Sequence, residues 1–113
     1  MTPETAIKRQ ICSWLQLNGI FIFTHDSVGI YDPTKKKFRL NKDPFRLRGV
    51  SDLLGLYNGK FLAIEVKRPG TYPTKEQKEF IKKVNKLGGI AFVARSIDDV
   101  IENLNMHEQE NKY

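Results

Sequence analysis

An Asn58-Gly59 pair between two mostly apolar runs constrains the fold more than any other feature of this sequence. In such a setting Asn-Gly predicts a two-residue type I′ turn and therefore a β-hairpin. A turn of this length also fixes the strand register, so that Tyr57 pairs with Lys60. Continued along both strands, this register places Asp52 directly opposite Glu65.

Two carboxylates in that position would normally weaken a hairpin. Directly opposed side chains have Cβ atoms about 4.5–5.5 Å apart, and like charges at that separation are destabilising. Because side chains alternate between the faces of a strand, Lys67 is expected on the same face as Glu65 and Asp52. The pattern therefore predicts a site made of two carboxylates and one ammonium group.

Length and composition favour one small domain in a non-membrane, cytoplasmic setting. The chain has 113 residues, of which 40% are hydrophobic, so it can bury one modest core. No segment approaches the roughly 20 apolar residues that span a bilayer, and the polar start of the chain lacks the apolar stretch of a signal peptide.

The metal-ligating residue types exclude a zinc cluster. Cys12 is the only cysteine, and His25 and His107 are far apart in the sequence. Any bound metal is therefore expected to be a hard cation on oxygen ligands. The formal charge of +6 and the pI near 9.5 favour an anionic polymer as partner.

Capping residues and hydrophobic periodicity predict an α/β fold with a mixed sheet flanked by helices. Thr74 and Gln77 form a capping box before one of the helices. The expected elements are a helix over 3–18, a strand over 19–25 that is buried on both faces, an excursion hairpin between 25 and 49, the hairpin around Asn58-Gly59, a helix over 75–86, a strand over 90–94 and a helix over 96–104. The segment from 61 to 94 should form a parallel strand-helix-strand crossover. Residues 1–104 form the expected domain, and residues 105–113 form a polar, frayed tail.

An acid near the start of the first helix is unusual. Glu4 lies three positions before Ile7, so it is expected to extend the apolar stripe of Ile7 and Ile11 and not to join Lys8 on the charged side. Its alternative role is only to interact favourably with the positive end of the helix dipole.

The hairpin acids suit Mg²⁺, which takes one or two carboxylates and keeps several waters. The backbone carbonyl of Val66 could add a third protein oxygen. Lys67 would then stand where an attacking water or a pentacovalent phosphate needs positive charge.

A basic segment is expected to follow the DNA backbone through phosphate contacts, which carry no base information. Its alternative interpretation is an ordinary solvated loop. The candidate DNA-binding residues are Lys35, Lys36, Lys37, Arg39, Lys42, Arg46, Arg48 and, after the hairpin, Arg68.

At these residues the chain resembles a nuclease superfamily. Asp52 followed by Glu65-Val66-Lys67 is similar to the D…E-x-K signature of PD-(D/E)xK nucleases. The approach Gly49-Val50-Ser51-Asp52, the acid in the first helix, and Gln77 further resemble the VRR-NUC (virus-type replication-repair nuclease) family, over residues 4–94. The sequence departs from the family pattern at two positions. Ser51 stands where the superfamily name has proline, and the aromatic residue near Gln77 is Phe80, which has no tyrosine hydroxyl.

The resemblance implies a restriction-endonuclease-like α-β-β-β-α-β core and a metal-dependent DNA endonuclease. It implies that Asp52, Glu65, Val66 and Glu4 bind Mg²⁺ or Mn²⁺, and that Lys67 and Gln77 join Asp52 and Glu65 in catalysis. It further implies a homodimer that acts on branched DNA such as four-way (Holliday) junctions, as in DNA repair. The alternatives are a flap or restriction-type nuclease, an RNA nuclease, and a DNA-binding module without catalysis.

Overall fold

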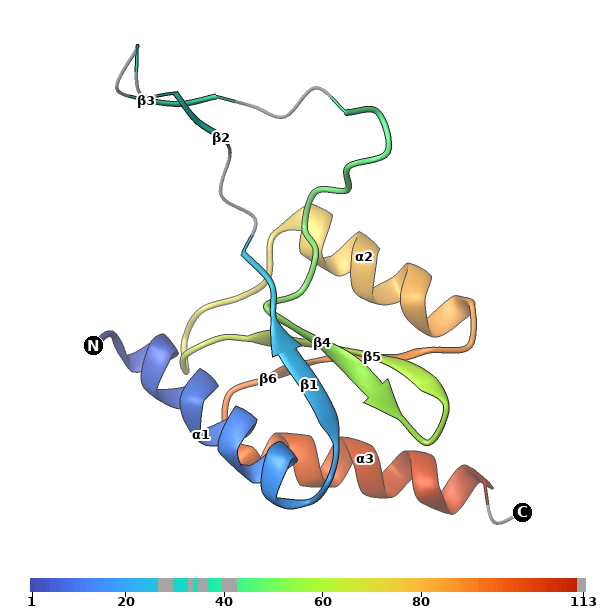
Figure 1. Ribbon diagram of the computed structural model, residues 1–113. Helices are drawn as coiled ribbons and strands as arrows, with labels where there is room; N and C mark the ends of the chain where they lie inside the picture. Colours follow the sequence, from blue (N-terminus) through green and yellow to red (C-terminus); the bar gives the residue numbers. More distant parts are fainter. Residues whose placement is uncertain (27–29, 33, 35–36, 40–42, 112–113) are drawn as a thin grey trace.

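The computed structural model describes residues 1–26, 30–32, 34, 37–39 and 43–111, which form an α/β fold (Figure 1). A four-stranded mixed sheet has the strand order β1-β4-β5-β6, and β2 and β3 pair separately. The predicted fold class is confirmed. The elements are α1 (Pro3–Leu17), β1 (Phe21–Thr24), β2 (Ile30–Asp32), β3 (Lys37–Arg39), β4 (Leu53–Tyr57), β5 (Lys60–Val66), α2 (Lys75–Lys86), β6 (Ile90–Ala94) and α3 (Ile97–Asn111).

The hairpin of β4 and β5 has the predicted register. Asn58 and Gly59 have φ angles of 50° and 79°, the left-handed conformation that a type I′ turn requires at both central positions. The ladder runs from the Tyr57–Lys60 pair to the Leu53–Ile64 pair. Asp52 therefore lies one residue before β4, at the end of the ladder and not within it.

The two faces of the sheet are covered by different helices. Helices α1 and α3 contact each other and lie on one face, and α2 lies on the other (Figure 1). Ile64 and Val66 of β5 belong to the same buried cluster as Ile11 and Leu15 of α1. Because side chains alternate along a strand, Glu65 points to the opposite face, toward α2.

Strand β1 is less buried than the sequence predicts. Only Ile22 is buried, whereas Phe21 and Phe23 are exposed. β1 lies at the edge of the sheet, and α2 packs against β5 and β6, so the outer face of β1 has no helix over it. The expectation of a strand buried on both faces is wrong, because apolar content alone does not say how far a helix reaches across a sheet.

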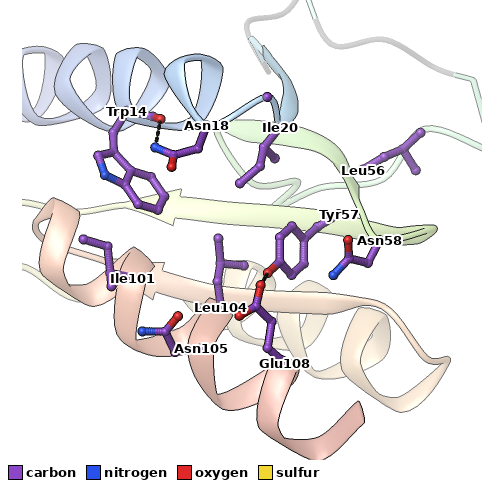
Figure 2. Close-up of a pocket in the computed structure, with 11 residues that line it drawn as sticks. Trp14, Asn18, Ile20, Leu56, Tyr57, Asn58, Ile101, Leu104, Asn105 and Glu108 are labelled. Atoms are coloured by element: carbon purple, nitrogen blue, oxygen red, sulfur yellow. Dashed lines mark hydrogen bonds between the residues drawn. The ribbon is translucent and has the colours of Figure 1, made fainter. Parts of the chain in front are cut away.

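Helix α3 continues to Asn111, well beyond the predicted end at Leu104. The hydroxyl of Tyr57 donates a hydrogen bond to Glu108 (Figure 2). Burial and this hydrogen bond raise the pKa of Tyr57 to about 12. The prediction of a frayed tail from residue 105 is therefore wrong up to Asn111, because the polar sequence gave no sign of a tertiary contact with β4.

Strands β2 and β3 form the predicted excursion hairpin, which lies apart from the four-stranded sheet (Figure 1). We call residues 25–49 the arm. Among the candidate DNA-binding residues of the arm, Lys35, Lys36 and Lys42 fall outside the described residues. Within the described ranges, no helix has both the length and the apolar character needed to cross a membrane.

Candidate active site

Asp52 is held at the end of the β4–β5 ladder by two hydrogen bonds. Its Oδ2 atom accepts the backbone N–H of Val66 at 3.0 Å, and its carbonyl oxygen accepts the backbone N–H of His25 at 2.7 Å. The side chain is 24% exposed. The backbone of both neighbouring strands therefore fixes a carboxylate that solvent can still reach.

Glu65 is almost completely buried, with 1% exposure. Its Oε1 atom accepts a 3.0 Å hydrogen bond from the Gln77 amide and lies 3.7 Å from the Lys67 ammonium nitrogen. Its Oε2 atom is also buried and has no hydrogen-bond partner within the described part of the chain. Burial, and then the negative charge of Asp52, raise the pKa of Glu65 to about 7, although the Lys67 charge opposes the shift.

Gln77 connects the acid to the start of α2. Its side-chain oxygen accepts the backbone N–H of Thr74 at 2.8 Å, and Thr74 Oγ1 accepts the backbone N–H of Gln77 at 3.2 Å. The predicted capping box is confirmed. Because the oxygen of this amide caps the helix, its nitrogen is directed to Glu65.

The segment before Asp52 packs directly on the first turn of α2. Gly49 has a φ of 74°, and a Cβ atom there would lie 2.3 Å from the carbonyl carbon of Glu76. Only glycine fits both this conformation and this contact. The Gly49–Asp52 approach and the capping turn that carries Gln77 are thus positioned against each other.

A groove lies beside these acids, between the start of α1 and the segment after β5. Its volume is about 450 Å³. The lining residues are Thr2, Pro3, Glu4, Thr5, Lys8, Lys67, Arg68 and Thr71. The groove therefore brings the predicted site residues Glu4 and Lys67 together with two further cations, Lys8 and Arg68.

Lys8 is a site residue that the sequence interpretation missed. Its ammonium nitrogen lies 3.9 Å from Oδ1 of Asp52, and it lines the groove together with Glu4. The expectation that Glu4 would lie apart from Lys8 is wrong, because residues four positions apart share one face of a helix. That spacing is the signal that could have placed Lys8 in the site.

The structure brings Asp52, Glu65, Lys67 and Gln77 together, with Val66 between two of them. Glu4 reaches the groove. Across the ranges that the structure describes, however, no three side chains of His, Cys, Asp or Glu form a metal cluster, so Glu4 does not complete a three-carboxylate set.

The donor atoms still suit a hard cation. Mg²⁺ uses one or two carboxylates and otherwise keeps its waters. The buried Oε2 atom of Glu65, which lacks a partner among the described residues, is the oxygen that a cation would satisfy. The residues present therefore fit the metal that the sequence resemblance implies.

The predicted DNA-binding residues are only partly placed. Arg68 lines the groove and is exposed, and Arg48 is exposed just before the Gly49–Asp52 approach. Arg46 is half-buried. Lys37 and Arg39 lie in β3, where the structure describes the backbone.

A second hollow, of about 440 Å³, lies on the other face of the sheet. Trp14 of α1, Tyr57 of β4 and Asn105 of α3 line part of it (Figure 2). Helices α1 and α3 cover this face, whereas Glu65 points toward α2. The hollow is thus separate from the acid pair.

Comparison with known proteins identifies the fold. No family model matches this sequence, and no curated protein is similar to it. A solved structure titled "VRR_NUC domain protein" superposes with a TM-score of 0.63 and 23% sequence identity, over 94% of this chain and 88% of that chain. The α/β architecture described above agrees with this likeness. The chain has the fold of a VRR-NUC domain, as its sequence motifs predicted.

Proposed function

We propose that this protein is a metal-dependent endonuclease that hydrolyses phosphodiester bonds in DNA. The observation that carries the proposal is the buried Glu65 carboxylate, whose Oε2 atom lacks a partner in the described part of the chain and whose charge is opposed by that of the second carboxylate, Asp52. Such a carboxylate pair is costly to keep unless a cation binds it. The VRR-NUC fold is the context in which a nuclease site of this kind is expected.

Asp52, Glu65 and the carbonyl oxygen of Val66 would hold Mg²⁺ or Mn²⁺. When bound, the metal would polarise a phosphoryl oxygen and lower the pKa of a bound water. The hydrogen bond from Val66 N–H fixes one oxygen of Asp52, which leaves its Oδ1 atom for other contacts. Glu4, in the adjoining groove, would act on the metal shell through water.

Two ammonium groups flank the acids. Lys67 lies 3.7 Å from Glu65, where its charge would stabilise a hydroxide or the negative charge that develops on phosphate. Lys8 lies against Asp52, with its ammonium nitrogen 3.9 Å from Oδ1. Gln77 acts through Glu65, since its amide fixes the direction of that carboxylate.

DNA would bind through its backbone. The chain has a formal charge of +6, and Lys8, Lys67 and Arg68 line the groove beside the acids. The basic residues of the arm would continue this phosphate contact away from the groove. Binding of this kind selects shape and charge and not base sequence.

We further propose that the protein is a homodimer that cuts branched DNA, with four-way junctions as the first substrate to test. Two sites related by a dyad suit symmetric incision of such a junction. The support for this step is the sequence resemblance of residues 4–94 to the VRR-NUC family, which implies a homodimer that acts on branched DNA. A flap or restriction-type nuclease on the same fold is the alternative within enzymes.

Cleavage assays with matched variants test the proposal. Labelled four-way junction, flap and linear duplex are incubated with the protein in Mg²⁺, Mn²⁺ or EDTA. Metal-dependent cleavage is expected, with its loss in Asp52→Asn and in Lys67→Ala, while binding to the junction persists. A flap that is cut faster than the junction would favour the flap nuclease.

The second candidate is a DNA-binding module without catalysis. Its support is the raised pKa of Glu65, because a carboxyl that keeps its proton near neutral pH could share it with Asp52. Tight DNA binding without cleavage in any metal, unchanged in Asp52→Asn, would establish this candidate and overturn the nuclease.

A further inference from the structure

Tyr72 is an exposed aromatic residue next to the groove. The residue is 75% exposed and lies in the segment that joins β5 to α2. We call residues 67–74 the β5–α2 loop. The neighbouring residue Thr71 lines the groove together with Arg68 and Lys67. Tyr72 is therefore at the rim of the site that we assign to phosphate.

The ring of Tyr72 is supported from one side. The guanidinium carbon of Arg95 lies 5.4 Å from the ring centroid, within the range of a cation–π contact. The same guanidinium donates a 2.8 Å hydrogen bond to the carbonyl oxygen of Thr71. Arg95 itself is anchored, since its backbone N–H donates to Asp99 at 2.8 Å. One face of the ring is thus covered, and the high exposure of the residue leaves the other face to solvent.

The β5–α2 loop is also ordered from within. Thr71 donates from its backbone N–H and from its hydroxyl to the carbonyl oxygen of Arg68, at 3.2 and 2.8 Å. Pro69 and Pro73 restrict the backbone further. A ring held in this way loses little conformational entropy when a flat ligand stacks on it.

Glu65 contacts residues on both sides of Tyr72 in the sequence. Lys67, at its start, lies 3.7 Å from Oε1 of Glu65, and Gln77, just after it, donates to the same oxygen at 3.0 Å. The position of Tyr72 is therefore tied to that of the acid pair. A ligand on its open face would lie beside the groove.

A nucleobase fits this open face. Bases stack on aromatic side chains without regard to sequence, because every base has a π-face. Inside a continuous duplex both faces of every base are already stacked. A base at a branch point, in a flap or at a duplex end has an unstacked face that can contact an aromatic ring.

We propose that Tyr72 is a specificity residue that stacks on an unpaired base next to the bound phosphate, and so favours branched or single-stranded DNA over continuous duplex. This inference rests on the proposed function, because it assumes that the groove binds the DNA backbone. It deepens that function by assigning the choice of substrate shape to one side chain.

Binding measurements in EDTA test the inference without cleavage. Wild type, Tyr72→Ala and Tyr72→Phe are titrated with a flap, whose unpaired segment carries 2-aminopurine, and with a linear duplex. Tyr72→Ala is expected to weaken flap binding about tenfold and to leave duplex binding within twofold, with loss of the fluorescence quenching that stacking produces. Tyr72→Phe is expected to keep both the affinity and the quenching.

Equal effects of Tyr72→Ala on flap and duplex, or no effect on either, would overturn the inference and leave the nuclease proposal standing. A wild-type protein that binds neither DNA would overturn both. Circular dichroism spectra of the variants separate these outcomes from a loss of fold, and Tyr72→Phe repeats the test with the ring in place.

Discussion

The amide of Gln77 donates a 3.0 Å hydrogen bond to the buried carboxylate of Glu65 while its oxygen caps α2. One side chain therefore fixes both the start of the helix and the direction of the acid. These two roles use different atoms of the amide, so substitution can separate them.

Gln77→Glu is expected to keep the cap and to damage the site. Its carboxylate can still accept the backbone N–H of Thr74, but it offers a negative charge to Glu65 in place of a donor. We expect DNA cleavage to fall at least tenfold. Gln77→Ala should also lose the hydrogen bond from the Thr74 backbone N–H, although the Thr74 hydroxyl still caps the helix, and should cost about 1 kcal/mol of stability. Initial cleavage rates and urea unfolding check the pair, and wild-type rates in Gln77→Glu would show that the hydrogen bond to Glu65 is dispensable.

The metal-free protein is expected to lose stability as the pH rises. Since burial and Asp52 raise the pKa of Glu65 from 4.5 to about 7, the native state keeps a proton between these values that the unfolded chain releases. The unfolded state then binds fewer protons, so the free energy of unfolding falls across this window, by about 1–3 kcal/mol. Urea titrations at pH 4.5 and 7.5, in EDTA, measure this change.

Glu65→Gln is the control for that pH dependence. It removes the titrating group, so the difference between wild type and variant isolates the contribution of Glu65 from those of other groups. Mg²⁺ should raise the melting temperature of wild type more at pH 7.5 than at pH 5, because a carboxylate must lose its proton to bind metal. If the free energy of unfolding changed equally with pH in wild type and in Glu65→Gln, the prediction would be contradicted.

Two glycines with the same backbone conformation are expected to respond differently to alanine. Gly19 and Gly49 have φ angles of 72° and 74°, but a Cβ at Gly19 meets nothing within 4 Å. Gly19→Ala should cost about 1–2 kcal/mol, the strain of the left-handed conformation alone. Gly49→Ala should cost more, about 3 kcal/mol or above, because its Cβ collides with the backbone of Glu76. Equal urea midpoints of unfolding for Gly19→Ala and Gly49→Ala would show that the contact of Gly49 with α2 is unimportant for stability.

The basic arm is expected to control the salt dependence of DNA binding. If Lys35, Lys36 and Lys37 contact phosphates, their replacement by glutamine should reduce the slope of log affinity against log salt by about 0.9 for each lost contact. Three exposed lysines of α2, at positions 82, 83 and 86, provide a control with the same change in charge. A slope that changes equally in both triple variants would assign the effect to net charge and not to the arm.

Local signals predicted much of the fold. The Asn58-Gly59 turn determined the register of β4 and β5, and with it the proximity of Asp52 to Glu65. The capping box of Thr74 and Gln77 located the start of α2. Both signals lie within a few residues of the feature that they specify, so the sequence alone reveals them.

Contacts between distant parts of the chain could not be predicted in the same way. The ion pair of Lys8 with Asp52 and the hydrogen bond from Tyr57 to Glu108 depend on how α1 and α3 dock on the sheet. The stacking of Arg95 on Tyr72 likewise joins the end of β6 to the β5–α2 loop. Periodicity shows which face of an element is apolar, but not which polar groups meet once the faces are packed.

The arm leaves the four-stranded sheet and returns to it at a single point. Thr24 at the end of β1 and Leu53 at the start of β4 are partners in the antiparallel ladder. Because the ends of the insertion are already held together, each doubling of its length adds only about 0.6 kcal/mol of closure entropy. Evolution or an engineer can therefore replace the part of the arm between His25 and Gly49, which both contact the site, without moving the carboxylates.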